Sequence, residues 1–287
     1  MRKVGYFFLS FVPLILATVI EYTAVFFMMG VSALFAVPGH PKGMNVYDYL
    51  YEIWMDTDFN IVIMMVFSLI GICGFGLWYY LRCDGEFFPD VKKTFHPVQF
   101  AAIALLIPGT QFISSIITSV LAEMVPSWMD HYEDLMESAG MDERLTVFLF
   151  CYSVILAPIG EELIFRGVTL RTARLALPFW AANILQAVLF GVFHGNVIQG
   201  CYAAFLGLFL GYVCERGGSI YYSIFFHFLF NLWGTVISEF LNFTSDIYIA
   251  LLMFTGILVL FPIGMVLFHM GDKLKKQANS YPQALVR

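Results

Sequence analysis

The sequence predicts an all-α fold in which a bundle of helices crosses a membrane, and three observations support this prediction. Of the 287 residues, 60% are hydrophobic and only 13% are charged, and the mean hydropathy is +0.79. Soluble domains are nearer one half apolar and one quarter charged. The apolar residues gather in runs of about 17–30 residues, which are long enough to cross about 30 Å of hydrocarbon as helices. We therefore expect a single polytopic membrane domain over residues 1–287.

Eight apolar runs are long enough to be spans. They cover residues 4–35, 59–81, 98–121, 144–168, 178–195, 197–215, 219–240 and 246–270. The first run follows Met1-Arg2-Lys3 and is far longer than the 7–15 apolar residues of a signal peptide. We therefore expect it to be the first membrane helix, retained in the protein.

The distribution of basic residues predicts the orientation, because Lys and Arg are enriched in cytoplasmic loops. With a cytoplasmic N-terminus and eight spans, only Lys42 and Arg144 of the 15 basic residues lie outside. The remaining basic residues are Arg2, Lys3, Arg82, Lys92, Lys93, Arg166, Arg171, Arg174, Arg216, Lys273, Lys275, Lys276 and Arg287. With an odd number of spans, the last three lysines would lie outside and the asymmetry of the basic residues would be lost. We therefore expect both termini to be cytoplasmic.

Two outer loops and the sixth span carry further patterns. Apolar residues recur at helical spacing at Val46, Leu50, Ile53 and Trp54 in the first outer loop, and at Trp128, Tyr132, Leu135 and Ala139 in the second. Each pattern predicts a short helix lying on the outer leaflet. Small residues gather near one face of the sixth span at Gly200, Ala203, Ala204, Gly207 and Gly211. Such a stripe lets neighbouring helices approach closely in lipid.

The fourth span ends in charged residues, in the run Gly160-Glu161-Glu162-Leu163-Ile164-Phe165-Arg166. Three unpaired charges in the hydrocarbon would cost about 8–10 kcal/mol, and ionisable groups inside membrane segments usually have a function. Glu162 and Arg166 are four residues apart, which predicts an ion pair on one face of the helix. Glu161 lies about 100° around the helix and has no such partner, so it is the candidate general base.

Two of the six histidines stand in apolar helices with few other polar groups, in Phe190-Gly191-Val192-Phe193-His194 and in His227-Phe228-Leu229-Phe230-Asn231. Asn231 follows His227 by four residues and therefore shares its face. Counting about 1.5 Å per residue from the cytoplasmic ends places Glu161 about 10 Å deep, His227 about 13 Å deep and His194 about 24 Å deep. For these groups to meet, the fifth span must be short or strongly tilted, or its start near Pro178 must lie less deep than this count assumes.

The three motifs Glu161-Glu162-x-x-x-Arg166, Phe190-x-x-x-His194 and His227-x-x-x-Asn231, in this order on membrane helices, resemble those of the CPBP family of intramembrane proteases. This family includes type II CAAX prenyl endopeptidases and bacteriocin-immunity proteins. The resemblance covers about residues 145–240, which would form the protease core. It implies an endopeptidase that acts on a membrane-associated peptide or protein within the lipid bilayer.

Transferred onto these positions, the resemblance implies that Glu161 and His194 activate a water molecule. His227 and Asn231 would stabilise the oxyanion, while Glu162 and Arg166 would hold the fourth helix in register. A zinc ion bound by Glu161, His194 and His227 is an open alternative, although the HExxH spacing is absent and a metal-free glutamate mechanism is favoured.

Two other functions remain open. A membrane regulator or a bacteriocin-immunity protein of the same fold would use the polar cluster as a scaffold without catalysis. A transporter would use Glu21 together with the buried acids and histidines, but such proteins usually show repeated halves, and no internal repeat is present here. We expect no nucleic-acid partner. The absence of an organelle signal favours a bacterial cell membrane, in which a prenylated substrate is not expected.

Overall fold

The computed structural model describes residues 2–82, 94–138, 145–237, 241 and 244–280, and these residues form helices joined by short turns, with no strand among them. The predicted all-α fold is confirmed. In chain order, the helices are α1 (Arg2–Leu9), α2 (Val12–Gly39), α3 (Val46–Trp54), α4 (Thr57–Arg82), α6 (Pro97–Met124), α7 (Pro126–Ser138), α8 (Val147–Phe150), η1 (Cys151–Leu156), α9 (Ala157–Glu162), η2 (Leu163–Leu170), α10 (Arg171–Arg174), α11 (Phe179–Phe193), α12 (Val197–Gly217), α13 (Ile220–Leu232), η3 (Trp233–Ile237), α15 (Asp246–Thr255), η4 (Gly256–Leu260) and α16 (Phe261–Ser280). The segments η1 to η4 are π-helical.

Seven stretches of the described residues are long and apolar enough to cross a membrane, and each coincides with a predicted span. They are Arg2–Gly39, Thr57–Leu81, Pro97–Met124, Val147–Arg174, Val197–Gly217, Ile220–Ile237 and Asp246–Gln277.

The remaining predicted span, 178–195, is the shorter apolar helix α11, which has 15 residues. At about 1.5 Å per residue α11 is about 22 Å long, less than the hydrocarbon thickness of about 30 Å. The predicted fifth span is therefore a short helix, which is one of the alternatives that the depths of the polar residues left open. The cytoplasmic location of both termini stays a prediction. Several residues used in the sequence analysis lie outside the described part of the chain: Lys92, Lys93, Ala139, Arg144 and Arg287.

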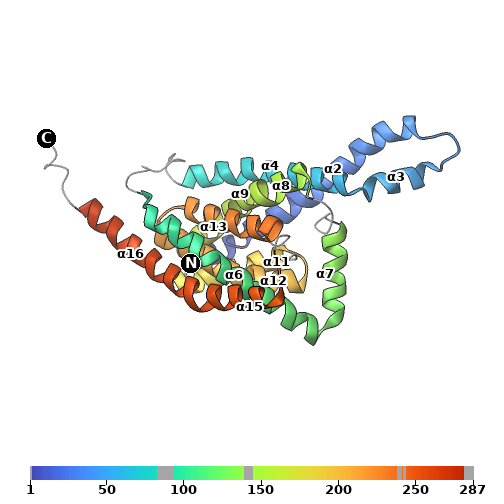
Figure 1. The fold of residues 1–287 in the computed structure, drawn as a ribbon. Helices are drawn as coiled ribbons and strands as arrows, with labels where there is room; N and C mark the ends of the chain where they lie inside the picture. Colours follow the sequence, from blue (N-terminus) through green and yellow to red (C-terminus); the bar gives the residue numbers. More distant parts are fainter. Residues whose placement is uncertain (1, 83–93, 139–144, 238–240, 242–243, 281–287) are drawn as a thin grey trace, which may run out of the picture.

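The two predicted outer-loop helices are present as α3 and α7. Helix α3 begins after Asn45, whose side chain accepts a hydrogen bond from the Tyr47 backbone N–H. It packs on α2 through a hydrogen bond from Trp54 Nε1 to Ser32 Oγ of 2.9 Å. Helix α7 lies across the direction of the long helices, at the end of the molecule where α2 and α3 project (Figure 1).

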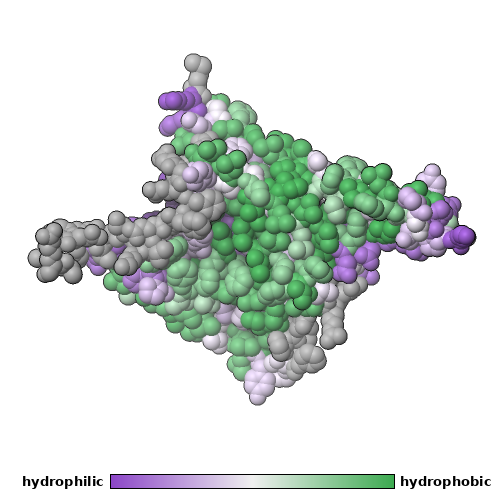
Figure 2. Space-filling view, turned by 90° about the horizontal axis from the view of Figure 1, so that it is seen from above, coloured by the Kyte–Doolittle hydropathy of each residue, from purple (hydrophilic) through white to green (hydrophobic). Residues whose placement is uncertain are grey.

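Large apolar side chains cover much of the outer surface, as expected for helices that face lipid. Among them, Phe26 and Phe35 of α2 are 71% and 79% exposed. Figure 2 shows a broad apolar region across the middle of the molecule, with hydrophilic residues gathered towards its ends. Inside the bundle, the fully buried side chains include Phe165 of the fourth span, which shares one core cluster with Phe190 and Phe226.

Helices α11 and α12 lie so close together that glycine is needed at their contact. A Cβ atom at Gly200 would lie 2.9 Å from the Gly191 carbonyl oxygen, and a Cβ atom at Gly207 would lie 3.1 Å from Ala187 Cβ. The small residues predicted to form a packing stripe on the sixth span therefore face α11. This close approach matters for the site, because it brings the carbonyl of Gly207 to the buried side chains of the fourth span.

Candidate active site

The fourth span, Val147–Arg174, carries the two glutamates on a short α-helical segment between two π-helical ones. π-Helical turns inside α-helices are frequent at functional sites. Glu161 and Glu162 are the last two residues of α9, and they point in different directions. The Glu161 side chain is 15% exposed and lines a cavity, whereas the Glu162 side chain is fully buried.

Glu162 forms a buried ion pair with Arg166. The distance between Arg166 Nη1 and Glu162 Oε1 is 2.8 Å, and both side chains have no exposed surface. Arg166 also donates from Nη2 to the Gly207 carbonyl of α12 at 3.3 Å, and its guanidinium carbon lies 4.5 Å from the centre of the Phe190 ring. The pair thus ties the fourth span to both α11 and α12.

Two polar residues of α11 that the sequence analysis did not single out complete this network. Gln186 Nε2 donates to the same Gly207 carbonyl at 2.9 Å and to Asn183 Oδ1 at 2.8 Å. Asn183 Nδ2 in turn donates to the Leu208 carbonyl at 3.0 Å. Both residues are fully buried. Their spacing of three residues within an apolar segment is the signal that could have identified them.

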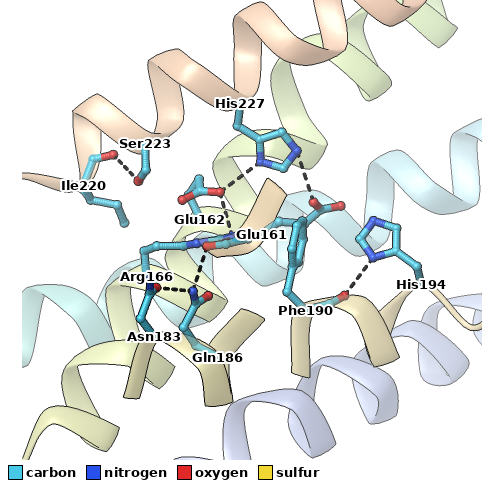
Figure 3. A network of polar contacts seen from close by, with 11 residues as sticks. Glu161, Glu162, Arg166, Asn183, Gln186, Phe190, His194, Ile220, Ser223 and His227 are labelled. Carbon is cyan, nitrogen blue, oxygen red and sulfur yellow. Dashed lines mark hydrogen bonds and ion pairs between the residues drawn. The ribbon is translucent and has the colours of Figure 1, made fainter. Parts of the chain in front are cut away.

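His227 lies between the two glutamates (Figure 3). Its Nδ1 atom is 3.0 Å from Glu162 Oε1, and its Nε2 atom is 3.6 Å from Glu161 Oε2. Since Glu162 Oε1 also accepts from Arg166, one carboxylate oxygen connects the arginine and the histidine. A carboxylate held by an arginine accepts hydrogen bonds, so Nδ1 of His227 is the donor in this contact.

His194 follows the last residue of α11, at a tight turn into α12. Gly195 adopts the left-handed conformation with φ of 71°, and the Asn196 side chain caps α12 by accepting from the Gln199 backbone N–H. The His194 Nδ1 atom is 2.8 Å from the Phe190 carbonyl oxygen. A carbonyl can only accept, so Nδ1 carries the proton and Nε2 of the neutral ring remains an acceptor.

Phe190 separates the two histidines. Its ring centroid is 4.8 Å from that of His194 and 5.8 Å from that of His227, and both contacts are edge-to-face. In Figure 3 the rings of His194 and His227 lie on different sides of Glu161. The structure therefore brings the groups of all three sequence motifs into one neighbourhood.

The side chain of Asn231 is held by a carbonyl that a proline leaves free. The Ala157 N–H donates to the Tyr152 carbonyl in the π-helical register, so in that register the next N–H would bind the Ser153 carbonyl. The next residue is Pro158, which has no N–H. The Ser153 carbonyl instead accepts from Asn231 Nδ2 at 2.8 Å. The sequence analysis missed this role of Pro158, although a proline three residues before Glu161 was a visible signal.

Replacing Pro158 with alanine is therefore expected to restore a backbone N–H that competes with Asn231 for the Ser153 carbonyl. Looser positioning of Asn231 should lower kcat of the hydrolysis proposed below by roughly tenfold or more, with little change in KM. Pro108→Ala in α6 serves as the matched control, because Pro108 is also inside a membrane helix but does not line the cavity. Equal rates for wild-type and Pro158→Ala protein would contradict this account of Asn231.

One cavity of about 1050 Å³ reaches Glu161, His194, His227 and Asn231. It extends past a polar stripe of α6 towards α7. The stripe consists of Gln111, Ser114, Ser115, Thr118 and Ser119, which recur at helical spacing and all line the cavity. Gln111 Nε2 also donates to the Phe230 carbonyl beside Asn231. These residues were not identified from the sequence.

Helix α7 closes the far end of the cavity. Tyr132, Leu135 and Met136 line the cavity. The apolar face of α7 therefore covers the cavity. Of the residues predicted to share this face, Trp128 lies at its edge and is 39% exposed. The outward face carries acidic residues instead, with Asp130 and Glu133 among the exposed positions.

The three residues that could hold a zinc ion, Glu161, His194 and His227, are not arranged as a metal site. In the part of the chain that the structure describes, no three His, Cys, Asp or Glu side chains are placed to hold one ion. Glu161 contacts His227, but the nearest polar partner of His194 is the Phe190 carbonyl. The donor set therefore does not fit zinc as it stands, and we derive no step through a metal.

A helical membrane protein in which a carboxylate and two imidazoles meet in a polar cavity among its spans has the features of an intramembrane hydrolase. Residues 143–233 match the family model described as type II CAAX prenyl endopeptidase Rce1-like, in agreement with the resemblance that the motifs indicated. The matched segment contains every motif residue from Glu161 to Asn231. No curated protein and no solved structure shows a significant match to the chain. This match supports protease activity, and the long apolar helices of the chain support an integral membrane protein.

Proposed function

We propose that the protein is an intramembrane endopeptidase that hydrolyses a peptide bond of a membrane-associated peptide or protein, without a metal ion. The observation that carries this proposal is the convergence of Glu161, His194, His227 and Asn231 on one cavity of about 1050 Å³. The cavity is large enough for several residues of a peptide chain, since ligand pockets commonly measure about 300–1,000 Å³.

Glu161 and His194 would activate the water molecule. The Glu161 carboxylate reaches the cavity and has no arginine or lysine partner among the described residues. His194 presents Nε2 as an acceptor, because Nδ1 donates to the Phe190 carbonyl. A water molecule that donates one proton to each of these acceptors would direct an oxygen lone pair at the substrate carbonyl.

His227 and Asn231 would stabilise the oxyanion. Nδ1 of His227 donates to Glu162, and Nε2 lies 3.6 Å from Glu161 Oε2, so His227 would donate to the oxyanion from Nε2 in its doubly protonated form. Asn231 uses one amide N–H for the Ser153 carbonyl and has a second one available. Each such donor aimed at the developing charge contributes about 3–4 kcal/mol to lowering the barrier.

The reaction then proceeds in two steps. Water oxygen bonds to the carbonyl carbon, Glu161 accepts the water proton, and the carbonyl oxygen becomes the oxyanion held by His227 and Asn231. Collapse of this intermediate breaks the C–N bond while the proton on Glu161 passes to the leaving nitrogen, giving a carboxylic acid and an amine. Transfer of the acid proton to the amine then gives a carboxylate and an ammonium group. Nε2–H of His227 would donate to the oxyanion in place of its contact with Glu161. Glu161 would then be free to act as the base.

The proposal is tested by comparing the membrane proteomes of native cells that produce either wild-type protein or Glu161→Gln. We expect at least one membrane-associated peptide to be processed only in cells with the wild-type protein. If Glu161→Gln fully replaces the wild-type protein in the cell and no peptide changes, the chain is a non-catalytic regulator or immunity protein of the same fold. Equal processing in both cells would also exclude Glu161 as the base.

A further inference from the structure

A second carboxylate lines the cavity, although it comes from a distant part of the sequence. Glu21 lies near the middle of the apolar helix Arg2–Gly39 and borders the cavity together with Val25. An ionisable residue at this depth is costly and usually has a function. None of the described residues forms an ion pair with it. The motifs and the catalytic proposal leave Glu21 without a role.

Glu21 gives the cavity a net negative charge, because the protonated His227 of the proposed mechanism offsets only Glu161. The described residues that line the cavity include no lysine and no arginine. Both acids line the same cavity, together with Tyr152. Arg166 does not offset them, because it is buried outside the lining and paired with Glu162. A negatively charged cleft with low-dielectric walls concentrates cations.

The wall of the same cavity also offers unused hydrogen-bonding groups. Ser114 of the α6 stripe is 6% exposed, and its hydroxyl has no partner within the described chain. Buried polar groups without a partner are rare in proteins, and the backbone of a bound peptide would supply one. The acidic outer face of α7 includes Asp130, Glu133, Asp134 and Glu137. This face would attract the same positively charged molecules to the end of the cavity that α7 covers.

We propose that Glu21 is a specificity-determining residue that binds a cationic group of the substrate while the scissile bond lies at Glu161. The substrate class is then an apolar, membrane-associated peptide that carries an amino or guanidinium group in the segment that occupies the cavity. This proposal rests on the proposed protease function for the position of the scissile bond, but the binding preference itself does not require hydrolysis.

The experiment measures binding separately from cleavage. Full-length protein carrying Glu161→Gln is reconstituted in vesicles of zwitterionic phosphatidylcholine, so that the lipid adds no net charge. The probes are fluorescent, N-acetylated apolar peptides of about 20 residues, which carry either one lysine or one norleucine at each position in turn. A third probe has norleucine and a free amino terminus, which distinguishes a side-chain amine from an α-amine.

We expect the best lysine or free-amine probe to bind about tenfold more tightly than its neutral counterpart, as for a hydrogen bond between charged groups. Adding Glu21→Gln should reduce this ratio to near one, whereas Glu21→Asp, which keeps the charge, should retain most of it. Glu52→Gln is the matched control, because Glu52 is an exposed acid of α3 outside this cavity. It should leave the ratio unchanged.

The outcomes separate the two proposals. The role of Glu21 is overturned if Glu21→Gln leaves the ratio of the two affinities unchanged. It is also overturned if charged and neutral probes bind equally well. Cleavage of both probe types by wild-type protein with equal kcat/KM would overturn that role and leave the protease function standing. A charge preference that depends on Glu21, with no cleavage of any bound probe by wild-type protein, would support the role of Glu21 and count against the protease function.

Discussion

Purified protein carrying Glu161→Gln is expected to hydrolyse the processed peptide about 10²–10⁴ times more slowly than the wild-type protein, with little change in KM. The substitution keeps the shape of the side chain but removes the proton acceptor, and a positioned general base contributes about this factor. The rates are measured under single-turnover conditions in detergent micelles or nanodiscs.

The fold of the Glu161→Gln protein should remain intact. The nearest charged neighbour of Glu161 is His227, with Nε2 3.6 Å away, and a side-chain amide can still accept a hydrogen bond there. Its unfolding transition in detergent should therefore match that of the Glu52→Gln control, which removes the same charge from the surface. A rate within threefold of wild type, in a protein that unfolds normally, would exclude Glu161 as the base.

The positions of the spans and of the motif residues could be predicted from the sequence, because both depend on local patterns. Apolar run length sets the spans, and the basic residues suggest an even number. The depth of His194 left a short fifth helix as one alternative, and α11 has only 15 residues. The pairing of Glu162 with Arg166 follows from their four-residue spacing within one helix.

The contacts between helices were not predictable in the same way. The sequence analysis expected Glu162 to act only with Arg166, whereas in the structure it also accepts from His227, which lies 65 residues further along the chain. The capture of the Ser153 carbonyl by Asn231 depends on a change of helical register at Pro158. Such a change leaves no periodic signal in an apolar segment. The cavity was also unpredicted, since its polar stripe on α6 consists of hydroxyl residues, which membrane helices often tolerate, and one glutamine.

Glu161 and Glu162 are neighbours in sequence, yet we expect their substitutions to act on different properties of the protein. Glu161 is partly exposed to the cavity and should affect the rate. Glu162 is fully buried, and its carboxylate joins three helices through Arg166 and His227. Substitution of Glu162 should therefore mainly lower the free energy of unfolding. It should affect the rate only indirectly, through the orientation of His227.

Arg166→Met is expected to lower the free energy of unfolding by about 3–5 kcal/mol, because it leaves the Glu162 carboxylate buried without its cation. The change also removes the donor to the Gly207 carbonyl and the contact with the Phe190 ring. Reversible unfolding in mixed micelles measures the loss. Arg174→Met is the matched control, because its pairing with Glu215 is about one third exposed and such pairs contribute about 0–1 kcal/mol.

The double variant Glu162→Met/Arg166→Met separates stability from catalysis. Replacing both charges with apolar side chains removes the unpaired ion, so much of the lost stability should return. The rate should stay low, because Nδ1 of His227 loses the acceptor that orients the ring. If the double variant were as unstable as Arg166→Met, packing around Phe190 rather than charge pairing would account for the loss. If it were fully active, Glu162 would have no part in positioning His227.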